Sequence, residues 1–302
     1  MAQRIKKGRD VSGILILDKP LNISSSQAVQ RIKRLYGAKK VGHTGSLDPL
    51  ASGVLPICLG HATKVSQYLL ASDKSYQFTM KLGQTTTTGD VEGDVLTERA
   101  VPVISPEQIT HLLSQYCGDI QQIPPMYSAL KHNGRRLYKI ARAGEVVERP
   151  ARDVTIKSLK LLSADTGSLT IEVCCTKGTY VRTLAEDLGE SLGCGAHVTF
   201  LRRIKTGPFE LERSLTLDQL EKHAGSFSSL DALLLGIDVA LLDYPAVTCS
   251  EEDKADLCMG RAVVHEGLAD HPLMRLNDPS GKIFGLGKRS QSNLLAPVRI
   301  FA

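Results

Sequence analysis

A segment rich in glycine and proline, from Gly42 to Pro56, constrains this chain more than any other feature. Its sequence, GHTGSLDPLASGVLP, contains three glycines, two prolines, one histidine and one carboxylate, that of Asp48. Glycine opens backbone conformations that are closed to other residues, and Pro49 biases Asp48 away from the helical region. The segment therefore predicts a rigid loop that presents Asp48, although an Asp-Pro pair on its own is typical of an ordinary turn.

The composition indicates a folded, mildly basic protein. The chain has 302 residues, 42% of them hydrophobic, and a formal net charge of +5. This charge is compatible with an RNA partner without establishing one. The seven cysteines include no C-x-x-C pair, and no apolar run approaches the roughly 20 residues that a membrane helix needs. We therefore expect a cytoplasmic protein with reduced cysteines, no metal site and no membrane contact.

Hydrophobic periodicity predicts an α+β fold. The segment 24–36 has apolar residues at helical spacing behind a serine cap, and further helices are expected over 105–117 and 179–192. Alternating or short apolar runs predict strands at 13–17, 54–59, 76–82, 154–162, 169–175 and 198–204. Because these helices and strands do not alternate regularly, we expect a mixed, largely antiparallel sheet.

A basic insertion interrupts the expected sheet at about 124–152. Between Lys131 and Arg152, seven basic residues face only two acidic ones, and Tyr127 and Tyr138 are nearby. Neutralisation of phosphates and stacking on bases need this combination, so we favour nucleic-acid binding over a solvated surface loop. The expected helix over 24–36 also has a basic face, for which a solvated surface and phosphate contact remain equally good interpretations.

The sequence predicts two domains. Residues 1–247 are expected to form the α+β domain with its insertion. The segment 248–302 has one short helix followed by strand candidates that glycine and proline interrupt. A β-rich unit of about 50 residues is marginally stable alone, so we expect it to pack against the larger domain.

The motifs of nucleotide-binding loops, G-x-G-x-x-G and Walker A, do not occur in the sequence. The Asp48 segment instead resembles the catalytic motif of the TruB family, the bacterial tRNA pseudouridine-55 synthases. Further matches follow in the family's usual order: GILILDKP at 13–20, ATK at 62–64, DKSY at 73–76, IPPMYSA at 123–129, KGTYVRTL at 177–184 and HVTFLRR at 197–203. The resemblance covers roughly residues 10–215, and beyond them only a small PUA-like RNA-binding module is suggested.

The resemblance implies a pseudouridine synthase fold and a reaction. Asp48 would be the essential nucleophile in the isomerisation of uridine 55 in the tRNA T-loop to pseudouridine. A carboxylate is ionised at neutral pH, so no metal or cofactor is implied. The uridine must first be flipped out of its loop. His43 would fill the gap that the base leaves, and Tyr76 would stack on the flipped base.

The remaining site residues also come from the resemblance. Arg182 matches the arginine that pairs with the catalytic aspartate, and its place at the start of an otherwise apolar helix independently suggests a buried partner. Tyr180 matches a tyrosine of the pocket, and the main chain of Leu201 matches a contact to the uracil edge. Lys19 and Lys64 correspond to positions near the active site or the RNA, and the insertion 124–152 corresponds to an RNA-clamping thumb.

One departure from the family pattern lies in the segment 84–90. The chain has Thr87 where the family often has an aspartate, whereas Asp90 is retained. The role of this loop is therefore left open.

Two rival functions compete with that of a stand-alone tRNA-modifying enzyme. One is a relative that needs guide RNA and protein partners, against which the basic insertion argues. The other is an RNA-binding module with a vestigial site, against which the joint presence of Asp48, Tyr76, Tyr180 and Arg182 argues. We expect a monomer that acts on tRNA without an obligatory protein partner.

Overall fold

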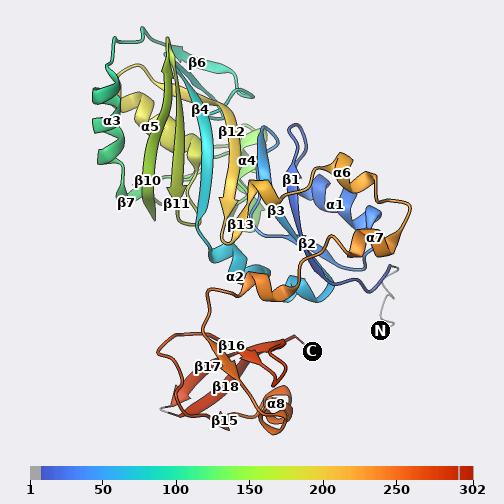
Figure 1. The fold of residues 1–302 in the computed structure, drawn as a ribbon. Coiled ribbons are helices and arrows are strands. Elements are labelled where there is room, and N and C mark those ends of the chain that lie inside the picture. Colours follow the sequence, from blue (N-terminus) through green and yellow to red (C-terminus); the bar gives the residue numbers. More distant parts are fainter. Residues whose placement is uncertain (1–7, 292, 302) are drawn as a thin grey trace.

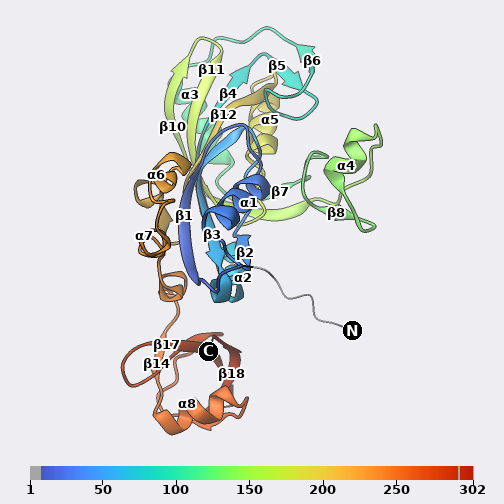
Figure 2. The same ribbon diagram turned by 90° about the vertical axis from the view of Figure 1, so that its right-hand side faces the viewer.

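The computed structural model describes residues 8–291 and 293–301. Its larger part is one mixed sheet with helices packed against it, and a smaller five-stranded unit follows towards the C-terminus (Figure 1). A lobe that contains helix α4 (Leu137–Arg142) stands away from the sheet (Figure 2). The prediction of an α+β fold with a small β-rich C-terminal module is confirmed.

The large sheet has nine strands in the order β1-β3-β12-β4-β11-β10-β7, with β2 beside β3 and β13 beside β12. Among these strands, β3 and β12 pair in parallel and the other pairings are antiparallel. The strands are β1 Gly13–Lys19, β2 Val41–His43, β3 Ala51–Leu59, β4 Lys74–Leu82, β7 Gly118–Gln122, β10 Arg152–Asp165, β11 Ser168–Cys175, β12 Ala196–Thr206 and β13 Phe209–Glu210. Two small hairpins lie outside the sheet: β5 Gln84–Thr86 with β6 Val95–Glu98, and β8 Lys131–His132 with β9 Arg135–Arg136.

Helix ends follow the capping residues that the sequence supplies. The Ser24 side chain accepts a hydrogen bond from Gln27 N, and the Gln27 side chain accepts one from the Ser24 backbone, so α1 begins where the sequence predicts. The same capping box, formed by Ser105 and Gln108, starts α3. Thr216 and Gln219 form a third capping box at α6, and the Ser226 side chain caps α7. No side chain caps α2 or α5, which are held mainly by packing. The helices are α1 Ser25–Leu35, α2 Ser66–Ala71, α3 Pro106–Gln115, α5 Val181–Ser191, α6 Leu217–Glu221 and α7 Phe227–Asp231, with short 3₁₀ turns at Gly60–Lys64, Leu211–Arg213 and Ile237–Ala240.

The glycine-rich segment forms a shorter loop than its sequence predicts. Its two ends belong to β2 and β3, so only residues 44–50 are loop. Gly53 therefore lies inside a central strand, at φ +104°, where an added Cβ would stand 2.1 Å from the Arg203 carbonyl oxygen. Here glycine serves the close approach of β3 to β12 rather than the flexibility of a loop.

The smaller unit has its own sheet, in the order β14-β16-β17-β18-β15, and its own apolar core around Leu257, Met274 and Leu276. It packs on the larger part as expected, because Ile283 and Phe301 join an apolar cluster that includes residues of β1, β3 and α2. Its elements are β14 Ala246–Thr248, α8 Glu251–Cys258, β15 Val263–Val264, β16 Met274–Asn277, β17 Ile283–Gln291 and β18 Leu294–Ile300.

Candidate active site

The register of the central strands brings the predicted site residues together. On β12, Leu201 pairs with Ala51 of β3 and with Phe78 of β4. Two residues further on, Arg203 pairs with Gly53 and with Tyr76. Because β3 leaves the Asp48 loop at this level, three segments distant in sequence converge at the middle of the sheet.

A cavity of about 410 Å³ opens at this point. Of the eight predicted site residues, the five that line it are Asp48, Tyr76, Tyr180, Arg182 and Leu201. The insertion contributes residues 128–130 to the wall, and the segment 176–181 before α5 closes another side. The cavity therefore lies between the Asp48 loop and the insertion.

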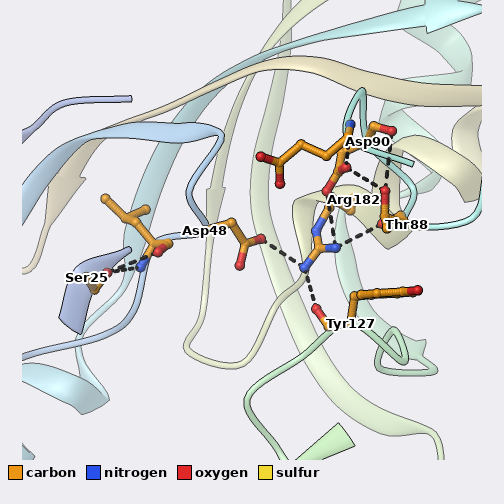
Figure 3. A network of polar contacts seen from close by, with 8 residues as sticks. Ser25, Asp48, Thr88, Asp90, Tyr127 and Arg182 are labelled. Atoms are coloured by element: carbon orange, nitrogen blue, oxygen red, sulfur yellow. Dashed lines mark hydrogen bonds and ion pairs between the residues drawn. The ribbon is translucent and has the colours of Figure 1, made fainter. Parts of the chain in front are cut away.

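The Asp48 carboxylate is paired with Arg182 (Figure 3), with 2.9 Å between Asp48 Oδ2 and Arg182 Nη2. The Arg182 side chain is 5% exposed and the Asp48 side chain 40% exposed. The loop itself is fixed from α1, where the Ser25 hydroxyl accepts from Leu47 N at 2.8 Å and donates to Leu47 O at 3.0 Å. The arrangement presents one carboxylate to the cavity while the arginine stays buried behind it.

Arg182 has three further partners, which approach its guanidinium from different sides (Figure 3). Nη1 lies 3.3 Å from Asp90 Oδ2 and donates to the Thr88 carbonyl at 2.9 Å. Nη2 donates to the Tyr127 carbonyl at 2.8 Å. A buried arginine with two carboxylates and two carbonyls around it has little freedom to turn, so it holds Asp48 in one direction.

Asp90 is the site residue whose role the sequence left open. Its side chain is 3% exposed, and its other oxygen accepts from the Thr88 hydroxyl at 2.6 Å and from Glu92 N at 3.0 Å. The backbone bridge between Asp90 and Val198 of β12 anchors this loop beside the site. Nothing local in the segment 84–90 signals this pairing, because it depends on a contact across the sheet.

Buried cations surround the cavity and bind main-chain oxygens. Lys19 Nζ donates to the carbonyls of Pro20 and Ile23, at 2.8 and 2.7 Å. Burial lowers the pKa of Lys19 to about 8, while the Asp48 charge acts in the opposite direction. Burial, reinforced by Arg203, likewise lowers the pKa of Lys74 to about 8.

Arg203 lies in a segment that matches the family, but the resemblance assigns it no role. It is 1% exposed, and it donates from Nε to Val54 O at 2.7 Å and from Nη2 to Gly45 O at 3.1 Å. One guanidinium therefore ties together the two arms of the Asp48 loop. The sequence indicated a place near the site for Arg203 only through its position two residues after Leu201.

The two tyrosines of the cavity are half-buried, and burial raises the pKa of both Tyr76 and Tyr180, so their phenols are neutral at pH 7. Gln122 holds the Tyr180 backbone by accepting from its N–H at 3.0 Å. The cavity therefore offers neutral aromatic surfaces beside one carboxylate.

The remaining predicted residues lie outside the cavity wall. Lys19 is buried behind it, and His43 in β2 has a buried Nδ1 with no hydrogen-bond partner among the described residues. Burial, aided by Arg203, lowers the pKa of His43, so its imidazole is neutral at pH 7. The structure does not bring Lys64 to the cavity: its Nζ donates to Ile300 O of the smaller unit at 3.3 Å.

The described residues contain no group of three or more His, Cys, Asp or Glu side chains that could hold a metal ion. Within the same residues, no helix is long and apolar enough to cross a membrane.

Solved structures share this fold. A chain in the crystal structure of a Cbf5-Nop10-Gar1 complex superposes with a TM-score of 0.75, at 26% identity, over 96% of this chain and 85% of that chain. A chain in the structure of an H/ACA RNP bound to a substrate RNA containing 2'-deoxyuridine superposes with a TM-score of 0.74 at 22% identity, over 100% of this chain and 92% of that chain, which shows the fold alone.

Family models match almost the whole sequence. Residues 33–181 match the N-terminal domain of the TruB family pseudouridylate synthases, residues 182–242 match the C-terminal domain of tRNA pseudouridylate synthase B, and residues 245–301 match the C-terminal model of pseudouridine synthase II TruB. Proteins named tRNA pseudouridine synthase B from Stutzerimonas stutzeri (strain A1501) and Pseudomonas aeruginosa (strain UCBPP-PA14) are each 50% identical over 302 residues, with 99% of both chains covered. Fold, cavity and matches together define a pseudouridine synthase, an isomerase that acts on RNA. Within this class, the chain belongs to the TruB family.

Proposed function

We propose that this enzyme isomerises uridine 55 in the T-loop of tRNA to pseudouridine, with Asp48 as the nucleophile. The observation that carries the proposal is the pairing of a half-exposed Asp48 carboxylate with a buried Arg182, at 2.9 Å, in the wall of a cavity large enough for a nucleobase. The name shared by the full-length relatives, tRNA pseudouridine synthase B, supports the substrate class.

The reaction breaks the bond between N1 of uracil and C1′ of ribose and forms one between C5 and C1′, while C5 loses a proton and N1 gains one. Two routes are open to the carboxylate, attack on C1′ or attack on C6 of uracil. Either route uses the Asp48 carboxylate as the nucleophile, held in place by Arg182. The cavity must also keep the detached base from leaving.

The neighbouring residues supply the other requirements of the reaction. Extrusion of the uridine costs a few kcal/mol, and stacking on Tyr76 offsets part of this cost, at about 1–3 kcal/mol per base. Tyr180 and the Leu201 main chain would contact the uracil, and His43 would fill the gap in the T-loop. Lys19 would place positive charge behind Asp48, whereas Lys64, held against Ile300, would act only near the RNA.

RNA binding would extend over the insertion and the smaller unit. We place the catalytic domain at 1–247 and an RNA-binding PUA-like domain at 248–302, a division that falls within β14. We further propose that the enzyme acts as a monomer, with no metal, cofactor or obligatory protein partner.

The test uses the purified protein alone with an unmodified tRNA transcript, and maps pseudouridine by carbodiimide labelling and primer extension. We expect modification at position 55 and none when that uridine is replaced by cytidine. Modification elsewhere would contradict the assigned position. Activity that appears only after protein or guide RNA is added would favour the rival that needs partners.

A further inference from the structure

Arg182 is shared between the Asp48 loop and the insertion, although Tyr127 has no role in the function proposed above. Its Nη2 nitrogen lies 2.9 Å from Asp48 Oδ2 and donates to the Tyr127 carbonyl at 2.8 Å (Figure 3). One planar nitrogen carries only two N–H groups. A displacement of the Tyr127 carbonyl therefore changes the direction in which that nitrogen holds Asp48.

The insertion is built so that movement of its helix reaches Tyr127. The N–H of Tyr138 in α4 donates to Ser128 O at 3.1 Å, and the N–H of Leu137 donates to Leu130 O at 2.8 Å. Ser128 follows Tyr127 directly in the chain. One backbone hydrogen bond, from Tyr138 to Ser128, thus links α4 to the residue that follows Tyr127, and the bond from Leu137 to Leu130 runs beside it.

The lobe is a compact unit with a closed base. Leu137 and Ile140 of α4 are 3% and 2% exposed, so the helix is packed within the lobe rather than loose. At the base, Arg149 Nη1 donates to Pro124 O at 3.1 Å, which joins the two ends of the insertion. We therefore expect a force on the outer surface to move the lobe as a unit, including its base.

The outer surface of the lobe is where a polyanion would apply such a force. Lys131, Arg136, Lys139 and Arg142 are exposed, and no ion pair is found for them among the described residues, although Arg136 Nη1 donates to the Ala129 carbonyl. Arg135 differs, because it is paired with Glu145 at 3.0 Å. Phosphates that neutralise the four exposed cations would draw α4 towards the RNA.

We propose that the main-chain carbonyl of Tyr127 is a positioning group, which couples the seating of RNA on the insertion to the placement of Asp48 by way of Arg182. The inference rests on the proposed function, since it assumes that Asp48 acts on an RNA held by the insertion. The carbonyl accepts from Arg182, which holds Asp48, so we expect it to affect the rate of the chemical step after RNA has bound. If the insertion contributed affinity alone, that rate would not depend on it.

The test compares Tyr138→Pro with Tyr138→Ala. Both variants lose the Tyr138 ring, which lies 5.9 Å from the Arg142 guanidinium, but only proline also removes the N–H that bonds to Ser128 O. Tyr138 is in the first turn of α4, where proline is tolerated. The ratio between the two variants therefore isolates one hydrogen bond of the connection.

The measured quantities are the Kd for a T-stem-loop RNA and the single-turnover rate constant at saturating enzyme. We expect the proline variant to bind as the alanine variant does and to react about 10-fold more slowly at saturation. Equal rate constants at saturation would overturn the inference. Failure of the wild-type protein to form pseudouridine in this assay would count against the proposed function instead.

A second variant decides the question if urea unfolding shows that Tyr138→Pro has disturbed the fold. Lys131→Gln, Lys139→Gln and Arg142→Gln together remove exposed charge. Arg136 is left unchanged, because its Nη1 donates to the Ala129 carbonyl beside Ser128. If the coupling exists, the single-turnover rate constant of this variant is lower even at saturating enzyme, because the RNA phosphates no longer attract α4. A weaker Kd with an unchanged saturating rate constant would show that the insertion provides affinity only.

Discussion

The Arg182 guanidinium holds the Asp48 carboxylate at 2.9 Å while being far more buried than its partner, at 5% against 40% exposure of the side chain. The arginine is therefore the fixed member of the pair, and the carboxylate is the member offered to substrate. This asymmetry suits a nucleophile that must reach a reacting carbon while it stays paired with a fixed cation.

The first prediction concerns Asp90, the second carboxylate on Arg182. Asp90→Asn keeps the shape of the side chain but removes a buried negative charge 3.3 Å from Nη1. We expect the single-turnover rate constant to fall by about 10-fold or more, because Arg182 is free to turn away from Asp48. The free energy of unfolding should fall by about 1–3 kcal/mol. The matched control is Asp94→Asn, an exposed position in the same loop, and an equal effect of both changes would contradict this role for Asp90.

The second prediction concerns Glu186, one helical turn after Arg182. Its carboxylate lies against Gly89, where an added Cβ would stand 2.8 Å from Oε1. Burial first, and then the charge of Asp187, raise the pKa of Glu186 from 4.5 to about 7; Asp90 also raises it, while Arg182 and Arg149 lower it. Between these two pH values the folded state binds more protons than the unfolded state, so the free energy of unfolding falls as the pH rises, and it levels off above pH 7.

Glu186→Gln should remove this dependence. Relative to wild type, the variant should gain about 1–3 kcal/mol in unfolding free energy between pH 5 and pH 8, measured by urea unfolding. Glu190→Gln is the control on the same helix, because pairing with Arg99 lowers the pKa of Glu190 and keeps it ionised at both pH values. If Glu186→Gln and wild type showed the same pH dependence of the unfolding free energy, the proton would not be bound by Glu186.

The third prediction concerns the salt dependence of RNA binding. Arg136→Gln and Arg142→Gln together should reduce the magnitude of the slope of log Kd against log salt, by about 0.7–0.9 for each phosphate that the insertion no longer neutralises. Arg99→Gln removes a cation already paired with Glu190 and provides the control. A slope that stays the same in the double variant would mean that these two arginines contact no phosphate.

The fourth prediction concerns Gly53. Alanine there meets both a φ of +104° and the Arg203 carbonyl oxygen at 2.1 Å, so β3 and β12 must separate at the site. We expect a loss of at least about 3 kcal/mol in unfolding free energy. Gly134→Ala provides the comparison, since its φ is +82° with nothing within 4 Å, and conformational strain alone costs about 1–2 kcal/mol. Similar losses at both positions would show that the close approach is unimportant.

Local signals in the sequence accounted for most of the elements. Caps at Ser24 and Ser105 marked the starts of two helices, and alternation from Tyr76 to Leu82 marked a strand of the sheet. Arg182 is a charged residue in the otherwise apolar start of α5, which indicated that it has a buried partner. These features are set by near neighbours in the chain, which is why a single sequence reveals them.

Interactions between segments that are distant in the chain could not be predicted from these local signals. The pairing of Asp90 with Arg182 depends on the bridge from Asp90 to β12, and the hydrogen bond to Tyr127 uses a backbone oxygen that any residue could supply. Lys64 contacts a carbonyl of the smaller unit because the two units pack together at that point, and its place near the RNA stays a prediction. The extent of the Asp48 loop was overestimated, since glycines that permit a turn also permit close approach between strands.

The most direct test of the proposed mechanism is the reaction of Asp48→Asn. Asparagine keeps a hydrogen-bond acceptor towards Arg182 but cannot act as a carboxylate nucleophile, so the variant should bind a T-stem-loop RNA as tightly as wild type. Single-turnover assays at saturating enzyme should then detect no pseudouridine at position 55. Pseudouridine formation by Asp48→Asn at the wild-type rate would contradict the role of Asp48 as the nucleophile.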